Sequence, residues 1–275
     1  MDVVGRHCPW LLMAVFAATS VVAQDPPAAE GLPEFAAVIA GVIDAQGGRE
    51  AHEKIKNRTL VGKVIIGEKP RATISSVTDN VGNYLEVLEF DGATRLEEGR
   101  NGELAWQRDP VQGARLKRGA EKAQAARLAE LHPVLALERH FVERKVEAIA
   151  YLGERRCTKL KLVPKEGDPE FWFVGPDFLV ARIILKVTSP AGDAELTIDF
   201  SDYRAVDGVQ LAHRWQIVRG KEKLDVIVEK YSHNVMKSDA DLTLPADVEK
   251  LPRETPEAKP PEPADKPVER PAGKD

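Results

Sequence analysis

Alternating apolar and polar positions dominate residues 196–245. Three runs with a period of two residues follow one another there, separated by Asp207-Gly208 and Arg219-Gly220. Such a period is typical of half-buried antiparallel strands, and glycine accepts the positive φ of tight turns. The segment is predicted to form a meander with one apolar face. The residues predicted on that face are Leu196, Ile198, Phe200, Val209, Leu211, His213, Trp215, Ile217, Leu224, Val226 and Val228.

Two kinds of periodicity precede this segment. Apolar residues at helical spacing end at Gly47-Gly48, which is typical of a helix with a glycine C-cap, and Pro133 can begin a helix. Helices are predicted over 34–46, 49–56, 117–131 and 134–140. Strands are predicted over 58–66, 71–77 (near a sheet edge), 83–90, 94–98, 103–107, 144–151, 156–163, 170–174 and 179–187, with hairpin turns at Asp91-Gly92 and Asn101-Gly102.

About eleven strands with two helical patches predict one α+β domain. A sheet of that size twists, so it is expected to curl into a large curved antiparallel sheet, an unclosed β-barrel covered by helices. The helical insert between 117 and 140 is expected to act as a lid or plug beside the sheet.

The ends of the chain have different compositions from the domain. Residues 1–23 are predicted to be a cleaved signal peptide. Basic residues near the start are followed by an apolar run and then by Val21-Val22-Ala23, which is a suitable cleavage site. The alternative is a retained membrane anchor, although the run is shorter than the roughly 20 residues that a span needs. Residues 24–33 predict a flexible leader, 34–245 the folded domain, and 246–275 a disordered tail rich in Pro, Glu and Lys. The expected location is periplasmic or secreted.

The charge and cysteine content exclude some classes of protein. The net charge of −5 over 275 residues gives no basic field for nucleic acid, and 43% hydrophobic residues suffice for a core. After removal of the signal peptide, Cys157 is the only cysteine, so no internal disulfide is expected, and a core position is favoured over a reactive thiol.

Catalytic motifs are missing from the sequence. No dinucleotide, Walker, GxSxG or HExxH pattern is present, and the histidines lack metal-ligand spacing. Asp199 and Asp202 form a conceivable acid and base pair, but strand and turn positions explain them more simply. His213 is interpreted as a hydrogen-bonded core residue rather than a ligand or catalytic group. We expect no enzyme activity, no metal and no cofactor.

Large apolar side chains on a curved sheet remain as the main functional feature. They are explained either as ordinary core packed on the helices or as the lining of a cavity for an apolar ligand. The candidate lining residues are Ile65, Leu85, Val87, Trp106, Phe171, Phe173, Ile183, Leu185, Ile198, Phe200, Leu211, Trp215 and Ile217.

Several weak motifs occur in the order found in one family. The segment GGREAHEKIKNRTLVGKV (47–64), the Asn101–Trp106 turn, the turn at 202–209 and the closing segment 231–245 together resemble exported proteins of the outer-membrane lipoprotein carrier (LolA/LolB-like) fold family. The resemblance covers about 40–245 and implies an unclosed β-barrel over helices, with a hydrophobic cavity for acyl chains. Two features depart from the family pattern: Leu211-Ala212 stands where Leu-Pro is common, and no residue is matched to the carrier's acyl-gating arginine.

These observations lead to three functional hypotheses. The first is a monomeric, non-enzymatic periplasmic binding protein that holds acyl chains or another hydrophobic ligand, with a lipid or lipoprotein as its partner. The alternative is an envelope sensor or interaction protein that engages another envelope protein through the groove or the tail. The third is an enzyme that acts on envelope material.

Overall fold

The computed structural model describes residues 31–90, 94–189, 192–236 and 242–253. The predicted signal peptide, most of the leader, the Asp91-Gly92 turn and residues 254–275 of the predicted tail lie outside the described residues. The folded unit begins at Leu32. Among the described residues, no helix has both the length and the apolar character that crossing a membrane requires.

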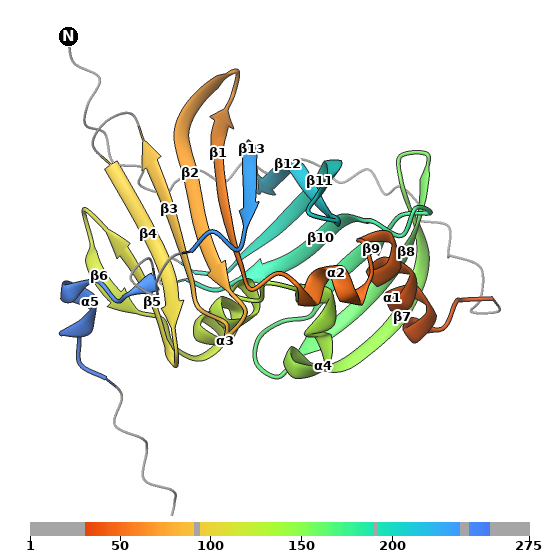
Figure 1. Cartoon of the computed structure of the whole chain (residues 1–275), viewed down its shortest axis with the longest axis horizontal. Coiled ribbons are helices and arrows are strands. Elements are labelled where there is room, and N and C mark those ends of the chain that lie inside the picture. Colours follow the sequence, from red (N-terminus) through yellow and green to blue (C-terminus); the bar gives the residue numbers. More distant parts are fainter. Residues whose placement is uncertain (1–30, 91–93, 190–191, 237–241, 254–275) are drawn as a thin grey trace, which may run out of the picture. The chain divides into compact units, whose positions relative to one another are not determined.

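Thirteen strands of the described chain form one sheet (Figure 1). Their order is β6-β5-β4-β3-β2-β1-β13-β12-β11-β10-β9-β8-β7, and all neighbours pair antiparallel. The edge strands β6 and β7 do not pair, so the predicted large unclosed antiparallel sheet is confirmed. The strands are β1 (Asn57–Ile66), β2 (Lys69–Asp79), β3 (Tyr84–Phe90), β4 (Thr94–Asn101), β5 (Leu104–Asp109), β6 (Gly113–Leu116), β7 (Phe141–Leu152), β8 (Arg155–Pro164), β9 (Glu170–Val174), β10 (Val180–Val187), β11 (Ala194–Val206), β12 (Val209–Arg219) and β13 (Glu222–His233).

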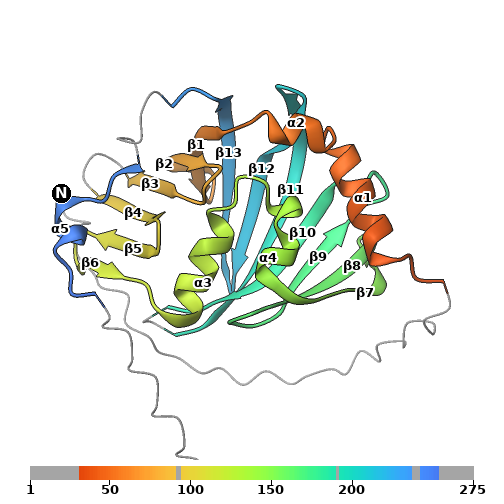
Figure 2. The same ribbon diagram turned by 60° about the horizontal axis from the view of Figure 1, so that its bottom comes forward.

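The helices before the first strand and those of the insert between β6 and β7 occupy one face of this sheet, which we call the inner face. The helical insert connects edge strand β6 to edge strand β7, so it has to cross the open side of the sheet. Figure 2 shows the strands fanning around α3 and α4, with α1 and α2 beside them. The helical elements are α1 (Phe35–Ala45), α2 (Arg49–Glu53), α3 (Gly119–Leu128), the 3₁₀ turn η1 (Pro133–Leu135), α4 (Leu137–His140) and α5 (Ala246–Glu249).

The structure corrects three local predictions. Strand β2 lies in the interior of the sheet between β1 and β3, not near an edge; it looks weak in the sequence because only Ala72 and Ile74 are buried along it. Strand β6 was missed because its four residues, GARL, show no alternation. The helix predicted over 134–140 is a 3₁₀ turn followed by one α-helical turn.

The turns and the first C-cap form where glycine allows a positive φ. Gly47 and Gly48 end α1 with φ of 111° and 81°, and the Gly48 amide donates to the Ile43 carbonyl over 2.8 Å. Asp207 and Gly208 join β11 to β12 with φ of 49° and 86°. A methyl group added at Gly47 would lie 1.9 Å from the Gly208 carbonyl oxygen, so the end of α1 contacts the β11–β12 turn directly.

Two hydrophobic clusters account for much of the inner face. One joins Val38 and Val42 of α1 to Leu160, Leu162 and Trp172 on strands β8 and β9. The other gathers residues of β1, β2 and β13 and extends to partly buried side chains of β3 and β12: Leu60, Val64, Ala72, Ile74, Val226, Val228, Leu88, Phe90, Trp215, Ile217, Leu224 and Tyr231. Helix α1 therefore fills part of the space that the curved sheet encloses.

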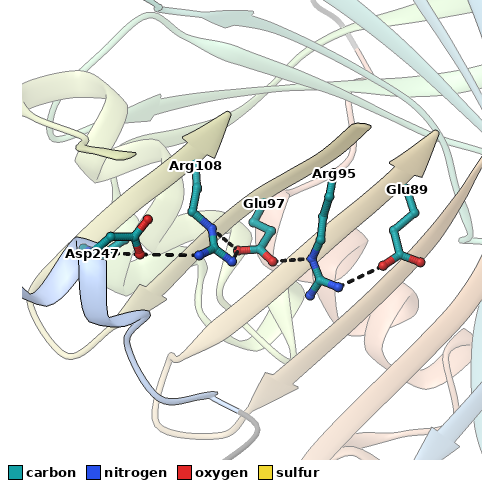
Figure 3. Close-up of polar contacts among 6 residues, drawn as sticks. Glu89, Arg95, Glu97, Arg108 and Asp247 are labelled. Atoms are coloured by element: carbon teal, nitrogen blue, oxygen red, sulfur yellow. Dashed lines mark hydrogen bonds and ion pairs between the residues drawn. The ribbon is translucent and has the colours of Figure 1, made fainter. Parts of the chain in front are cut away.

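A ladder of charges crosses the opposite, outer face of β3, β4 and β5 (Figure 3). Glu97, only 4% exposed, lies between Arg95 and Arg108, and Arg108 Nε donates to it over 2.7 Å. Arg95 also pairs with Glu89 over 2.8 Å, and Arg108 reaches Asp247 of α5 over 3.4 Å. The ladder thereby ties the end of the described chain to the sheet.

Helix α5 shifts the predicted boundary between domain and tail. The tail was predicted to begin at residue 246, but α5 begins there and Val248 is 1% exposed. One buried side chain with an ion pair beside it anchors a short segment that composition alone assigns to the tail.

Helix α3 covers a polar cluster on the inner face of β3 and β4. Lys117 pairs with Glu98 over 2.5 Å, and Glu86 lies beside them. Burial, together with the charge of Glu98, raises the pKa of Glu86 to about 8, and Lys117 opposes this rise. Glu86 is therefore mostly protonated at neutral pH.

Candidate binding pockets

Strands β12 and β13 separate along half of their length. They pair from Arg214 to Arg219, whereas β13 continues along β1 as far as His233. The Ala212 carbonyl, beyond that pairing, accepts hydrogen bonds from the Tyr231 hydroxyl at 2.9 Å and from Trp215 Nε1 at 3.1 Å. Side chains thus replace the missing backbone partner, and a pocket opens on the inner face at this place.

The first pocket has a volume of about 240 Å³. Its walls come from the α1–α2 segment, the insert, the start of β1 and the inner face of β9 to β13, and they are mainly apolar. The residues that line it are Gln46, His52, Arg58, Leu131, His132, Pro133, Val134, Trp172, Val180, Ile183, Phe200, Tyr203, Gln210, Leu211, Ala212, Trp215 and Tyr231.

The second pocket adjoins the first and has a volume of about 200 Å³. Helix α3 covers it, and Phe141, Leu185 and Ile198 contribute to its apolar walls. Both pockets are lined by Pro133, Trp172, Ile183 and Phe200. Each pocket alone is smaller than the ~300 Å³ at the low end of ligand sites, whereas the two volumes of about 240 and 200 Å³ together lie within that range.

Six of the thirteen candidate lining residues line these pockets. Their side chains come from the three successive strands β10, β11 and β12. They are Ile183, Leu185, Ile198, Phe200, Leu211 and Trp215. Ile217 lies on the same face but packs in the neighbouring cluster. Strict alternation on β12 stops near Ala212, because this residue and its neighbour Leu211 both line the first pocket.

The other six candidates line neither pocket, because the residue next to them in the strand occupies the inner position. Phe171 and Phe173 flank Trp172, which lines both pockets, and they pack instead with Cys157 and Ala181. The remaining four are neighbours of inner-face residues in the same way: Ile65 beside Val64, Leu85 beside Tyr84, Val87 beside Leu88, and Trp106 beside Ala105.

In strands β8, β9 and β10, apolar residues lie on both faces, so the sequence does not show which residues point to the inner face. The outer face of β8, β9 and β10 carries its own apolar cluster, and Lys159 Nζ lies 4.2 Å from the centre of the Phe171 ring. In the sequence Glu170–Val174, three consecutive aromatic residues therefore give no period of two. Trp172 is the pocket residue that sequence reasoning missed there.

One end of the first pocket is polar. His52 and His132, which are 80 residues apart, contact each other through their Nδ1 atoms at 3.0 Å, and His132 Nε2 lies 3.3 Å from the Ile55 carbonyl oxygen. Burial lowers the pKa of both imidazoles, that of His132 to about 4, and the charge of Arg58 adds to the effect. Both rings are therefore neutral at pH 7.

Arg58 lies at the same end of the pocket. Its Nε donates to His233 Nε2 over 3.2 Å, and His233 Nδ1 donates to Asp207 Oδ2 over 3.0 Å. Burial lowers the pKa of Arg58 to about 10, which leaves the guanidinium charged at neutral pH. No local sequence pattern predicts the contacts among Arg58, His233 and Asp207, because these residues come from three separate segments.

The polar residues that the sequence offered as candidate catalytic groups form ion pairs or hydrogen bonds within the fold. Asp199 pairs with Arg182 over 2.5 Å, and Asp202 pairs with Arg204 over 2.5 Å. His213 is buried with its Nδ1 3.0 Å from the Leu211 carbonyl oxygen, which agrees with a hydrogen-bonded core residue. Cys157 is buried and free, and burial raises its pKa. Among the described residues, no group of three or more His, Cys, Asp or Glu side chains is arranged to hold a metal.

The fold is similar to that of solved proteins, whereas no family model and no curated protein sequence matches the chain. A DUF1329 family protein from Desulfovibrio piger superposes with a TM-score of 0.53 at 13% identity, over 76% of this chain and 97% of that one. The LolA superfamily protein NE2245 from Nitrosomonas europaea gives 0.50 at 10% identity, over 76% of this chain and 98% of that one. The chain therefore has a LolA-like fold, as the sequence resemblance implied.

Proposed function

We propose that this protein is a non-enzymatic binding protein of the cell envelope that holds an acyl chain or another hydrophobic ligand in the two adjoining pockets. The observation that carries the proposal is the shared apolar wall of Trp172, Ile183 and Phe200 between the sheet and the helical insert. An apolar ligand would be stabilised there by removal of its surface from water, at about 25 cal/mol per Å².

The arrangement of the insert supports reversible loading. Helix α3 covers the second pocket and contacts the sheet mainly through small residues, Ala125 and Ala129, and through side-chain ion pairs such as Arg127–Glu170 and Glu121–Arg115. Displacement of α3 would open the second pocket without breaking strand pairing, so a ligand can enter and leave while the sheet stays intact.

An envelope location fits the predicted signal peptide and the likeness in fold to a LolA superfamily protein. Within this proposal, a lipid, an acyl chain or a lipoprotein is the partner. The fold by itself does not fix the activity, so the test has to detect the ligand.

The test combines native mass spectrometry with a matched pair of variants. Protein purified from its own envelope is expected to carry bound lipid. Ile183→Trp adds volume to the shared wall and is expected to abolish this co-purification. Ile184→Trp changes the next residue, on the outer face, and is expected to retain it. A wild-type protein free of lipid, or equal loading of both variants, would contradict the proposal.

A further inference from the structure

Arg58 is a partly buried cation in the wall of the first pocket, without a direct counter-ion among the described residues. No carboxylate in the described part of the chain forms an ion pair with it, and Asp207 is connected to it only through the His233 ring. A buried charge is costly unless an opposite charge or several hydrogen bonds compensate it. A structural role alone gives no reason to retain such a group at the end of an apolar pocket.

His52 supplies a second uncompensated polar atom in the same pocket. The residue is 3% exposed, and none of the described residues forms a hydrogen bond with its Nε2 atom. A carbonyl oxygen only accepts, so His132 Nε2 carries the hydrogen that points to Ile55, and neutral His132 accepts at Nδ1. His52 therefore donates from Nδ1, which makes its free Nε2 an acceptor.

From these two groups we infer that the first pocket binds the head group of an anionic amphiphile, an oxyanion that also carries an O–H, as a phosphate monoester does. The oxyanion would accept from the Arg58 guanidinium, and the O–H would donate to His52 Nε2. The hydrocarbon chain would lie along the apolar wall towards Trp172 and Phe200. The inference rests on the proposed function and adds the class of head group to it.

Both parts of the ligand have a physical reason to be present. Arg58 and His52 would recover hydrogen bonds that their burial removed, and charge-assisted bonds are the stronger kind. The wall beyond them is mainly apolar and continues into the second pocket, so a small free anion would leave most of the space unused. A neutral lipid would fill that space but leave both polar groups uncompensated.

The experiment uses four ligands with the mature protein stripped of bound lipid. Decyl phosphate, decanoate, decanol and inorganic phosphate are each titrated below their micelle concentrations in a calorimeter at pH 7. Decyl phosphate is expected to bind tightest, by about tenfold to a hundredfold over decanol, with decanoate between them. Inorganic phosphate alone is expected to bind at least about tenfold more weakly than decyl phosphate, because it lacks the chain.

Two variants assign the preference to Arg58. Arg58→Gln is expected to bring decyl phosphate to the affinity of decanol and to leave decanol unchanged. Arg204→Gln, on exposed β11, is the matched control and is expected to change neither. If Arg58→Gln does not fold, Arg58→Lys takes its place. Because it retains a positive charge, it is expected to bind decyl phosphate more tightly than decanol, as the wild type does. The comparison of the four ligands with the wild-type protein needs no variant.

The possible results separate the inference from the proposed function. Equal affinity for decanol and decyl phosphate would overturn the inference and leave the apolar pocket in place. If inorganic phosphate binds as tightly as decyl phosphate, the hydrocarbon chain does not contribute to binding, and the claim that the ligand is an amphiphile is overturned. A preference that survives in Arg58→Gln would overturn the assigned residue. Failure of all four ligands to bind would overturn the proposed function as well.

Discussion

The ion pair between Arg127 and Glu170 gives the sharpest test of how the helical insert is held. Arg127 Nε of α3 donates to Glu170 Oε1 of β9 over 2.7 Å, and the two side chains are 12% and 9% exposed. Trp172 Nε1 lies 3.4 Å from the second oxygen of Glu170. This pair connects the insert to β9, which contributes Trp172 to the shared wall of the pockets.

Replacement of one partner is expected to cost far more than replacement of both. Loss of one partner of a fully buried pair costs about 3–5 kcal/mol, and the residual exposure here reduces this to about 2–4 kcal/mol for Arg127→Met. The double variant Arg127→Met/Glu170→Met removes both charges and puts apolar volume in their place, so we expect it within about 1 kcal/mol of wild type. The expected coupling energy is therefore about 2 kcal/mol or more.

The assay is a double-mutant cycle from urea unfolding at pH 7, with the exposed pair Arg204 and Asp202 as the control cycle. The control pair is expected to couple by less than about 0.5 kcal/mol, as exposed pairs do. A coupling energy for Arg127 and Glu170 as small as that of the control would refute the view that this ion pair holds α3 on the sheet.

Three further predictions concern stability. Deletion of residues 246–275 is expected to lower the free energy of unfolding by about 2 kcal/mol more than deletion of 254–275, since only the longer deletion removes buried Val248; equal urea midpoints would contradict this. Glu86→Gln is expected to stabilise the protein increasingly from about pH 4.5 to 8, by roughly 2 kcal/mol at the upper end. The reason is that wild-type Glu86 keeps a proton in the folded state that the unfolded chain releases. Urea unfolding in which the gain does not change with pH would exclude protonation of Glu86 as the cause. Gly47→Ala is expected to cost more than about 2 kcal/mol, since φ is 111° and the added methyl overlaps a turn carbonyl; thermal melts close to wild type would disprove that contact.

The local structure could be predicted from the sequence with few errors. Alternating apolar residues predicted the meander of β11, β12 and β13. Glycine at positions 47, 48, 208 and 220 predicted a helix end and two turns. Both predictions succeed because backbone φ and the face of a strand side chain depend mainly on residue type and spacing. Strand β6 was missed and β2 was misplaced, since their buried residues are few and strand order depends on contacts distant in sequence.

The pocket residues were predicted only in part, for two physical reasons. Phe171, Phe173 and Trp106 do not line the two pockets, and the sequence did not indicate this, because both faces of their strands are covered and a period of two then carries no information. The half-length separation of β12 from β13, which opens the first pocket, depends on where two strands stop pairing, and no local pattern records this.

The sequence by itself determined that the chain forms strands and helices in this order and that it carries a large apolar surface, since both follow from residue type and spacing. Only the tertiary structure decided which side chains share a pocket. It brought Arg58 of β1 to the pocket that His52 and His132 also line, three residues from three segments. Within the described part of the chain, the partly buried charge of Arg58 has no direct counter-ion, and that is a property of the assembled pocket rather than of any stretch of the chain.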